Sequence, residues 1–185
     1  NDDNLSLESF RYINYFTGIW QNSRFLENSK NFLVSNLIKN DEISENFLST
    51  PKKNSVMLHI RMDNYSGEEV DLNYFYKSID FLKNEIKDDI SINLFSDSSS
   101  ILEEKKLINI VDTVNLPDEK IDDTLSTFAK MLNNDHFIIS NSTFSYMAAL
   151  MKSGGENISI IPTPWSVNKK PKDLSMPQFI EISRN

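Results

Sequence analysis

The chain alternates short apolar runs with longer segments in which apolar residues recur at helical spacing. The short runs predict buried β-strands in five places, at residues 55–61, 90–95, 110–114, 136–140 and 157–161. Helical spacing between them predicts helices at residues 72–87, 98–109, 122–134 and 142–152. Strands that alternate with helices favour an α/β fold, and right-handed crossovers would give a Rossmann-like parallel sheet with helices on both faces.

The two ends of the chain show weaker patterns. Residues 23–39 place apolar side chains near one helical face and predict a helix, which the polar sequence "NDEISEN" at residues 40–46 should end. The chain beyond Pro162 is rich in proline, so we expect an irregular tail there. The sequence thus predicts three parts: an N-terminal helical segment 1–50, a Rossmann-like domain 51–162 and a C-terminal tail 163–185 packed on it.

Composition excludes several classes of function. The chain carries a net charge of −8, whereas proteins that bind nucleic-acid backbones present basic surfaces, so we expect no nucleic-acid partner. It has no cysteine and two histidines, which excludes disulfides, iron–sulfur clusters and thiolate zinc sites and implies no metal. We also expect no cofactor. No apolar run approaches the roughly 20 residues that span a bilayer. We therefore expect a cytoplasmic protein with at most peripheral association with the inner face of the membrane.

Polar residues at the ends of the predicted strands are the candidates for function, because ligands of open parallel sheets bind beyond the carboxyl ends of the strands. His59 and Arg61 alternate on one face of the first strand, among apolar neighbours. A charged arginine there needs an anionic partner, either a ligand phosphate or a carboxylate of the protein. His59 is either a site residue or a hydrogen-bonded core histidine, and His136, at the start of a strand, is interpreted as structural.

Two serine-rich turns follow other strands. Asp97 or Ser98 in "FSDSSS" precedes a helix, and Ser142 or Thr143 in "SNSTFS" is suited to cap the next one. Both turns are explained either as ordinary N-caps or as anion sites, since the free N–H groups of a helix N-terminus attract phosphate. The acidic run "GEEVD" at residues 67–71 is expected in a solvated loop.

In order and spacing these segments resemble the α-1,2-fucosyltransferases of glycosyltransferase family 11. "SVMLHIRMDNY" stands where that family has a strand ending in His-x-Arg-Arg-Gly-Asp-Tyr, and "INLFSDSSS" is similar to its Phe-Ser-Asp-Asp turn. "NNDHFIISNSTFSYMAAL" is similar to its His-x-Ile-Ile-x-Asn-Ser-Thr-Phe-Ser-Trp-Trp signature, and "GIWQNSRFLE" and "LNYFYKSIDFL" are similar to two further segments. The resemblance spans roughly residues 15–170.

The resemblance implies one lobe of a GT-B-like, inverting, metal-independent glycosyltransferase, namely the lobe that binds the donor, with an N-terminal lobe missing. It implies transfer of fucose or a related sugar from GDP-fucose to a glycan acceptor such as a β-galactoside, as in bacterial surface polysaccharide synthesis. His59 and Arg61 match the motif's His and Arg, where the arginine would bind the pyrophosphate and stabilise the leaving GDP. The positions that would hold the nucleotide sugar are Asp97, Ser98, Asn141, Ser142, Thr143, Phe144 and Ser145.

Several positions differ from the family pattern. Met62 stands in place of the second arginine and Asn64 in place of the aspartate. Ser98 replaces the second acidic residue of the turn, and Thr127 occupies a helix position where the family usually has an acidic residue. The sequence therefore leaves two hypotheses: an active glycosyltransferase, and a weakened or inactive relative that binds a nucleotide or a partner protein without turnover. A response-regulator-like module also fits the alternating strands, but the expected acidic cluster after the first strand is missing.

Overall fold

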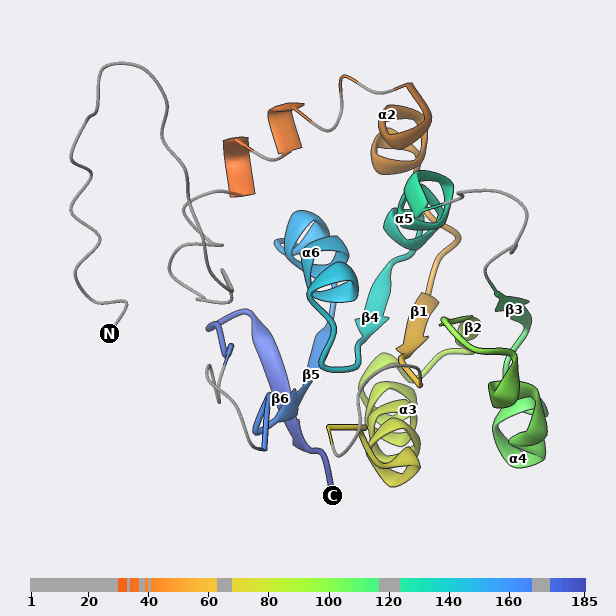
Figure 1. Ribbon diagram of the computed structural model, residues 1–185. Coiled ribbons are helices and arrows are strands. Elements are labelled where there is room, and N and C mark those ends of the chain that lie inside the picture. The colour runs from red at the N-terminus through yellow and green to blue at the C-terminus, as the bar shows by residue number, and fades with distance from the viewer. Residues whose placement is uncertain are drawn as a thin grey trace, which may run out of the picture.

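The computed structural model describes residues 30–32, 34–36, 39, 41–62, 68–116, 124–167 and 174–185. Its strands are β1 (Ser55–Ile60), β2 (Ser91–Ser96), β3 (Thr113–Asn115), β4 (His136–Ile138), β5 (Ser159–Thr163) and β6 (Phe179–Ser183). They form one six-stranded sheet in the order β3-β2-β1-β4-β5-β6, and every neighbouring pair is parallel (Figure 1). The predicted parallel sheet is confirmed.

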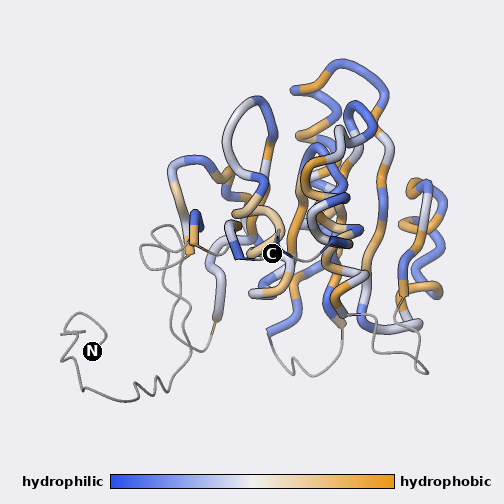
Figure 2. Tube along the Cα trace, turned by 90° about the horizontal axis from the view of Figure 1, so that it is seen from above, coloured by the Kyte–Doolittle hydropathy of each residue, from blue (hydrophilic) through white to orange (hydrophobic). Residues whose placement is uncertain are grey.

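Helices cover both faces of this sheet. They are α2 (Asp41–Leu48), α3 (Leu72–Ile86), α4 (Lys105–Ile108), α5 (Thr124–Leu132) and α6 (Thr143–Lys152), with a 3₁₀ helix, η2 (Ser99–Glu103). The helices α5 and α6 pack on one face and α3 on the other (Figure 1), and the two faces carry separate apolar clusters. Apolar residues run along the strands while the outer turns are polar (Figure 2), as expected for a sheet buried on both sides. The predicted α/β class, with helices on both faces, is confirmed.

The longest helix, α3, shows why the predicted boundaries hold where the local signals are strong. Asp71 caps its N-terminus, with the carboxylate accepting a hydrogen bond from the backbone N–H of Asn73 at 2.7 Å. Lys87 ends it in the left-handed conformation, with φ of 55°. One face of the helix buries Tyr74, Phe75, Ser78, Ile79 and Leu82. Capping and amphipathic spacing therefore agree, and α3 matches the predicted helix at residues 72–87 to within one residue.

The strand order reverses beside β1. From β1 the chain adds β2 and β3 on one side, and it then returns to place β4 on the other side of β1. Such a reversal opens a crevice between the carboxyl ends of the two central strands, which is where ligands of doubly wound sheets bind. Here the backbone N–H of Ser140, just after β4, donates to the carbonyl of His59 at 3.1 Å. The residues that follow β1 and β4 are thereby held side by side.

Three elements differ from the sequence predictions. The polar residues from position 41 on lie in the helix α2, which packs against α5, and Phe47 of α2 packs on the apolar cluster of that face. The predicted single helix at 98–109 is divided into η2 and α4. The third strand lies at Thr113–Asn115, at the end of the predicted range. Most of the predicted helix at 23–39 lies outside the described residues.

The C-terminal tail is not irregular, because it supplies the edge strand β6. Its register with β5 pairs Ser159 with Phe179 and Thr163 with Ser183. The prolines of the tail, at positions 164, 171 and 177, all precede the strand, so they do not remove any hydrogen-bond donor from it. The division of the chain into segments 1–50, 51–162 and 163–185 stays a prediction, although the sheet itself extends to residue 183.

A buried ion pair fastens this last strand to the loop that follows β1. The side chain of Arg184 is 2% exposed, and its Nη1 lies 3.5 Å from Oε2 of Glu68, which is 6% exposed. Nη1 also donates to the carbonyl of Trp165 at 3.1 Å, and Nη2 donates to the carbonyls of Glu68 and Glu69. The Glu68 carboxylate in turn accepts from the backbone N–H of Val167 at 3.0 Å. The expectation of a fully solvated acidic loop is therefore wrong for Glu68, because Arg184 supplies the charge that allows its burial.

We expect Arg184→Met to lower the free energy of unfolding by about 3 to 5 kcal/mol, because the buried Glu68 carboxylate loses its cation. Urea denaturation followed by circular dichroism measures the change. Adding Glu68→Gln to this variant removes the uncompensated charge and should restore part of the loss. Lys77→Met is the control, since Lys77 is an exposed cation that reaches the carbonyl of Asn185 at 2.9 Å and should cost less than about 1 kcal/mol. An unchanged midpoint for Arg184→Met would contradict a stabilising role for the pair.

Candidate functional site

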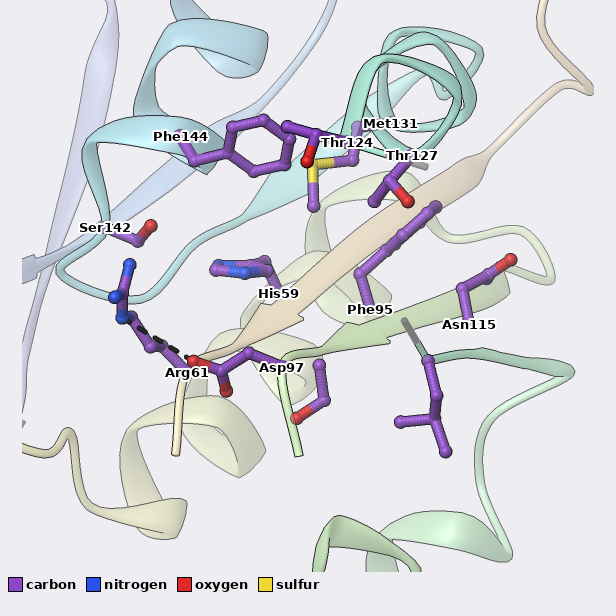
Figure 3. Close-up of a pocket in the computed structure, with 12 residues that line it drawn as sticks. His59, Arg61, Phe95, Asp97, Asn115, Thr124, Thr127, Met131, Ser142 and Phe144 are labelled. Carbon is purple, nitrogen blue, oxygen red and sulfur yellow. Dashed lines mark ion pairs between the residues drawn. The ribbon is translucent and has the colours of Figure 1, made fainter. Parts of the chain in front are cut away.

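A pocket with a volume of about 230 Å³ opens at the carboxyl ends of β1, β2 and β3 (Figure 3). Its lining comes from the ends of these strands, from one side of α5 and from the first turn of α6. The lining residues are His59, Arg61, Phe95, Ser96, Asp97, Asn115, Leu116, Thr124, Thr127, Met131, Ser142 and Phe144. Five of the predicted site residues are among them, namely His59, Arg61, Asp97, Ser142 and Phe144.

His59 reaches the pocket from the buried end of β1. The residue is 6% exposed, and its Nδ1 lies 3.0 Å from the hydroxyl of Ser140. The pKa of His59 is lowered to about 4, chiefly because burial disfavours the charged ring; the Asp97 carboxylate partly opposes this shift, and the Arg61 charge adds to it. His59 is therefore a neutral imidazole near pH 7.

Arg61 follows on the same face, as strand alternation predicts. Its Nε lies 3.6 Å from Oδ2 of Asp97, and the two side chains are 33% and 30% exposed. Asp97 is held from a second side, because its Oδ1 accepts a hydrogen bond from the backbone N–H of Met62 at 2.7 Å. Figure 3 shows the guanidinium group reaching beyond Asp97 toward Ser142. Arg61 therefore fits both interpretations. It pairs with a carboxylate of the protein, Asp97, and its guanidinium group also borders the pocket, where a ligand phosphate could bind.

Ser142 stands at the N-cap position of α6 but does not act as a side-chain cap. Its backbone has φ of −118° and ψ of 124°, and its hydroxyl makes no capping hydrogen bond. The residue is 0% exposed, and Oγ finds no hydrogen-bond partner among the described residues. The hydroxyl therefore lies unused beside the pocket, where the first N–H groups of α6 also lack intrahelical acceptors. The ordinary N-cap interpretation does not account for this serine.

Four predicted site residues do not line the pocket: Ser98, Asn141, Thr143 and Ser145. Ser98 is the ordinary cap of η2, since its hydroxyl accepts from the backbone N–H two residues later at 3.3 Å. Ser145 donates its hydroxyl to the carbonyl of Ser142 at 3.2 Å. Asn141 donates from Nδ2 to the carbonyl of Glu68 at 2.7 Å. Asn141 and Ser145 thus hold the turn between β4 and α6 in place.

The sequence patterns missed several lining residues. Asn115 ends β3, so the strand-end rule that identified His59 would also have identified it. Thr124, Thr127 and Met131 lie on one side of α5 at spacings of three and four residues, which is the signal of a shared helix face. Met131 is also 1% exposed and packs in the core, as its spacing predicts.

The second histidine lies at the opposite end of the sheet. His136 begins β4, and its Nδ1 accepts a hydrogen bond from the backbone N–H of Ile158 at 3.1 Å. Burial lowers its pKa, with the neighbouring Asp135 carboxylate opposing the shift. The structural interpretation of His136 is confirmed. Within the described ranges, no cluster of three or more histidine and acidic side chains is placed to hold a metal ion.

Within those same ranges, no helix has both the length and the apolar character that crossing a membrane requires.

Comparison with known proteins identifies a family. Residues 2–181 match the model of the family described as Glycosyl transferase family 11. The match covers nearly the whole chain, including the His59–Arg61 strand end and the turn that contains Ser142. The resemblance seen in the individual segments is thus confirmed over a longer stretch. No curated protein and no solved structure matches the chain significantly.

We expect the protein to lose stability as the pH falls from about 6.5 toward about 4. His59 has a pKa of about 4 in the folded state and an ordinary value of 6.5, so the unfolded state binds more protons in this window. This group alone should cost about 2 kcal/mol between pH 7 and pH 5. Urea denaturation at the two pH values measures the loss, and His59→Gln should reduce it. A loss of the same size in His59→Gln would contradict the assignment.

Proposed function

The chain belongs to glycosyl transferase family 11, and on that premise we propose that the pocket binds the diphosphate of GDP-fucose or a related nucleotide sugar. As a member of this family the protein is a glycosyltransferase. The proposed reaction is inverting transfer of the sugar to a glycan acceptor such as a β-galactoside, in the synthesis of a surface polysaccharide. In this proposal the fold is one lobe of a GT-B-like enzyme, and the reaction requires neither a metal ion nor a resident cofactor.

The observation that carries this proposal is the unpartnered hydroxyl of Ser142. A buried hydroxyl without a partner costs free energy, so its retention in a pocket suggests that a ligand completes it. Two further features of the same corner suit an anion. The guanidinium of Arg61 reaches toward Ser142, and the N-terminus of α6 favours negative charge. A diphosphate supplies the acceptor oxygens for all three.

Arg61 then has a role in the chemistry. As the glycosidic bond breaks, negative charge grows on the β-phosphate of the leaving nucleotide. A fixed guanidinium near this oxygen lowers the barrier, because it stabilises the transition state more than the ground state. Asp97 holds the arginine in place before the donor binds, so that little reorganisation is needed at the moment of reaction. We assign charge stabilisation to Arg61 and donor binding to His59 and Ser142.

The catalytic base is proposed to come from outside the described residues. Asp97 is the carboxylate that lines the pocket in the described part of the chain, and it is engaged by Arg61 and by the N–H of Met62. Glu68 is buried against Arg184 and is not available either. The proposal therefore includes a second lobe that brings the acceptor and the base. It also places the enzyme in the cytoplasm, with at most peripheral contact with the inner face of the membrane.

A second candidate function is nucleotide binding without turnover, and the position of Met62 favours it. Met62 stands where the family pattern has a second arginine, and its side chain packs against the apolar cluster beneath α3. It does not line the pocket, so this position adds no second cation to the diphosphate. Under this hypothesis the pocket holds GDP or a nucleotide sugar but does not cleave the donor.

Calorimetric titration with GDP, GDP-fucose and UDP-sugars tests both functions. We expect GDP and GDP-fucose to bind, and Arg61→Ala to weaken GDP binding roughly 10-fold to 100-fold, since hydrogen bonds to charged groups are the strong ones. Lys53→Ala is the control, because Lys53 pairs with Asp88 at 3.0 Å on the exposed surface beside the amino end of β1, whereas Arg61 follows its carboxyl end. Equal GDP affinity in wild type and Arg61→Ala would overturn the site. Binding without sugar transfer to any acceptor would favour the second candidate.

Ser142→Ala should separate binding from stability. Because the hydroxyl has no partner among the described residues, its removal should leave the free energy of unfolding unchanged or raise it. The same change should weaken GDP binding roughly threefold to tenfold, as the loss of one hydrogen bond predicts. Ser159→Ala is a matched control, since Ser159 is 2% exposed and its hydroxyl is also unpartnered, but it does not line the pocket. A destabilised Ser142→Ala with unchanged GDP affinity would count against the assignment.

A further inference from the structure

We propose that Ser140 is a positioning residue that fixes His59 with its proton on Nε2, so that His59 presents a hydrogen-bond donor, and not a base, to the bound ligand. Ser140 was not among the predicted site residues, and it does not line the pocket. The inference rests on the proposed function only where it concerns the ligand. The position of the proton is a property of the free protein.

Two contacts join Ser140 to His59. The hydroxyl of Ser140 lies 3.0 Å from Nδ1 of His59, and the backbone N–H of Ser140 donates to the His59 carbonyl at 3.1 Å. Ser140 is 1% exposed and His59 is 6% exposed, so water competes little for either group. The parallel pairing of β1 with β4 sets this distance, because His59 and Ser140 come one and two residues after the last paired position, Leu58 with Ile138. The contact is therefore built into the sheet.

The direction of the hydrogen bond follows from the acceptors that are available. Within the described part of the chain, Nδ1 of His59 is the acceptor that the Ser140 hydroxyl reaches. If Nδ1 carried the proton and donated to Ser140, the buried hydroxyl proton would be left without an acceptor, which is unfavourable. The hydroxyl therefore donates and Nδ1 accepts. A neutral imidazole has one N–H, so the proton lies on Nε2.

An Nε2–H group on His59 can donate a hydrogen bond to the diphosphate that is proposed to bind beside Arg61 and Ser142. His59 lines the pocket beside Arg61 and Ser142, and Figure 3 shows the nitrogen-bearing side of its ring directed toward these two residues. A guanidinium, a hydroxyl and the N-terminus of α6 all offer hydrogen to an acceptor. An Nε2–H adds a neutral donor to this set, whereas an unprotonated Nε2 would repel phosphate oxygens. Ser140 thus decides whether His59 assists or opposes the binding of a diphosphate.

His136 provides an internal reference for the proton position. Its Nδ1 accepts from the backbone N–H of Ile158 at 3.1 Å, and a backbone amide can act only as a donor. His136 must therefore carry its own proton on Nε2 when neutral. Because the chain has two histidines, the ring signals of the reference and of His59 can be compared directly in one spectrum.

Nuclear magnetic resonance of the ring nitrogens tests the proposal without a ligand. In ¹⁵N-labelled protein at pH 7, long-range proton–nitrogen correlations should give His59 the same Nε2–H pattern as His136. Ser140→Ala should shift the His59 pattern toward a mixture of the two neutral forms, because Nδ1 loses its donor, and should leave His136 unchanged. An Nδ1–H pattern for His59 in the wild-type protein would overturn the proposal, as would an unchanged pattern in Ser140→Ala.

Calorimetric titration with GDP tests the consequence for binding. Ser140→Ala should weaken binding roughly threefold to tenfold, and Ser140→Thr, which keeps the hydroxyl, should restore most of the affinity. Ser78→Ala is the matched control, since Ser78 is fully buried and donates to the carbonyl of Tyr74 at 2.7 Å within α3. Equal GDP affinity in wild type and Ser140→Ala would overturn the positioning role. If the wild-type protein bound no GDP, the proposed function would fail, and the resonance comparison would still decide where His59 carries its proton.

Discussion

The parallel pairing of β1 with β4 is the constraint on which the rest of the structure depends. It is the contact at which the strand order reverses, and it brings together the residues that follow two strands separated by about 80 positions in the chain. Its register matters because a shift by one residue would exchange the side chains of β1 that meet the two apolar clusters and would turn His59 away from Ser140. The position of His59 against Ser140, and of Arg61 near the N-terminus of α6, follows from this one pairing.

Local sequence patterns were sufficient to predict the helices and strands that carry a clear apolar run or an apolar face. Apolar residues are concentrated in the strands β1, β2, β4 and β5 and on one face of each of the helices α3, α5 and α6. These apolar surfaces have to be buried in any fold, so the elements can be predicted without knowing what they pack against. Two elements were wrongly assigned because tertiary contacts decide them. The helix α2 is polar along much of its length and is stabilised by packing on α5, and β6 depends on the free edge of β5. Neither partner can be recognised from the segment alone.

The candidate site shows the same division. Strand alternation was enough to place His59 and Arg61 on one face, and the family pattern directed attention to the turn that contains Ser142. What the sequence could not distinguish was a residue that lines the pocket from one that holds it in shape. Asn141 belongs to the family signature, yet it binds the carbonyl of Glu68 across 73 positions of the chain. The role of Asn141 depends on which backbone carbonyl lies within reach of its side chain. The strand order determines this carbonyl, and the local sequence does not show it.

The anchoring of the loop after β1 has a consequence for how this protein could diverge from its relatives. On one side the N–H of Met62 is tied to Asp97, and on the other side Glu68 is tied to Arg184 and Asn141. The replaced motif position Asn64 falls between these two anchors. The two anchors are made by other residues, namely Asp97 on one side and Arg184 with Asn141 on the other. The family motif can therefore vary at this position while the contacts that fix Met62 and Glu68 to the rest of the fold are kept.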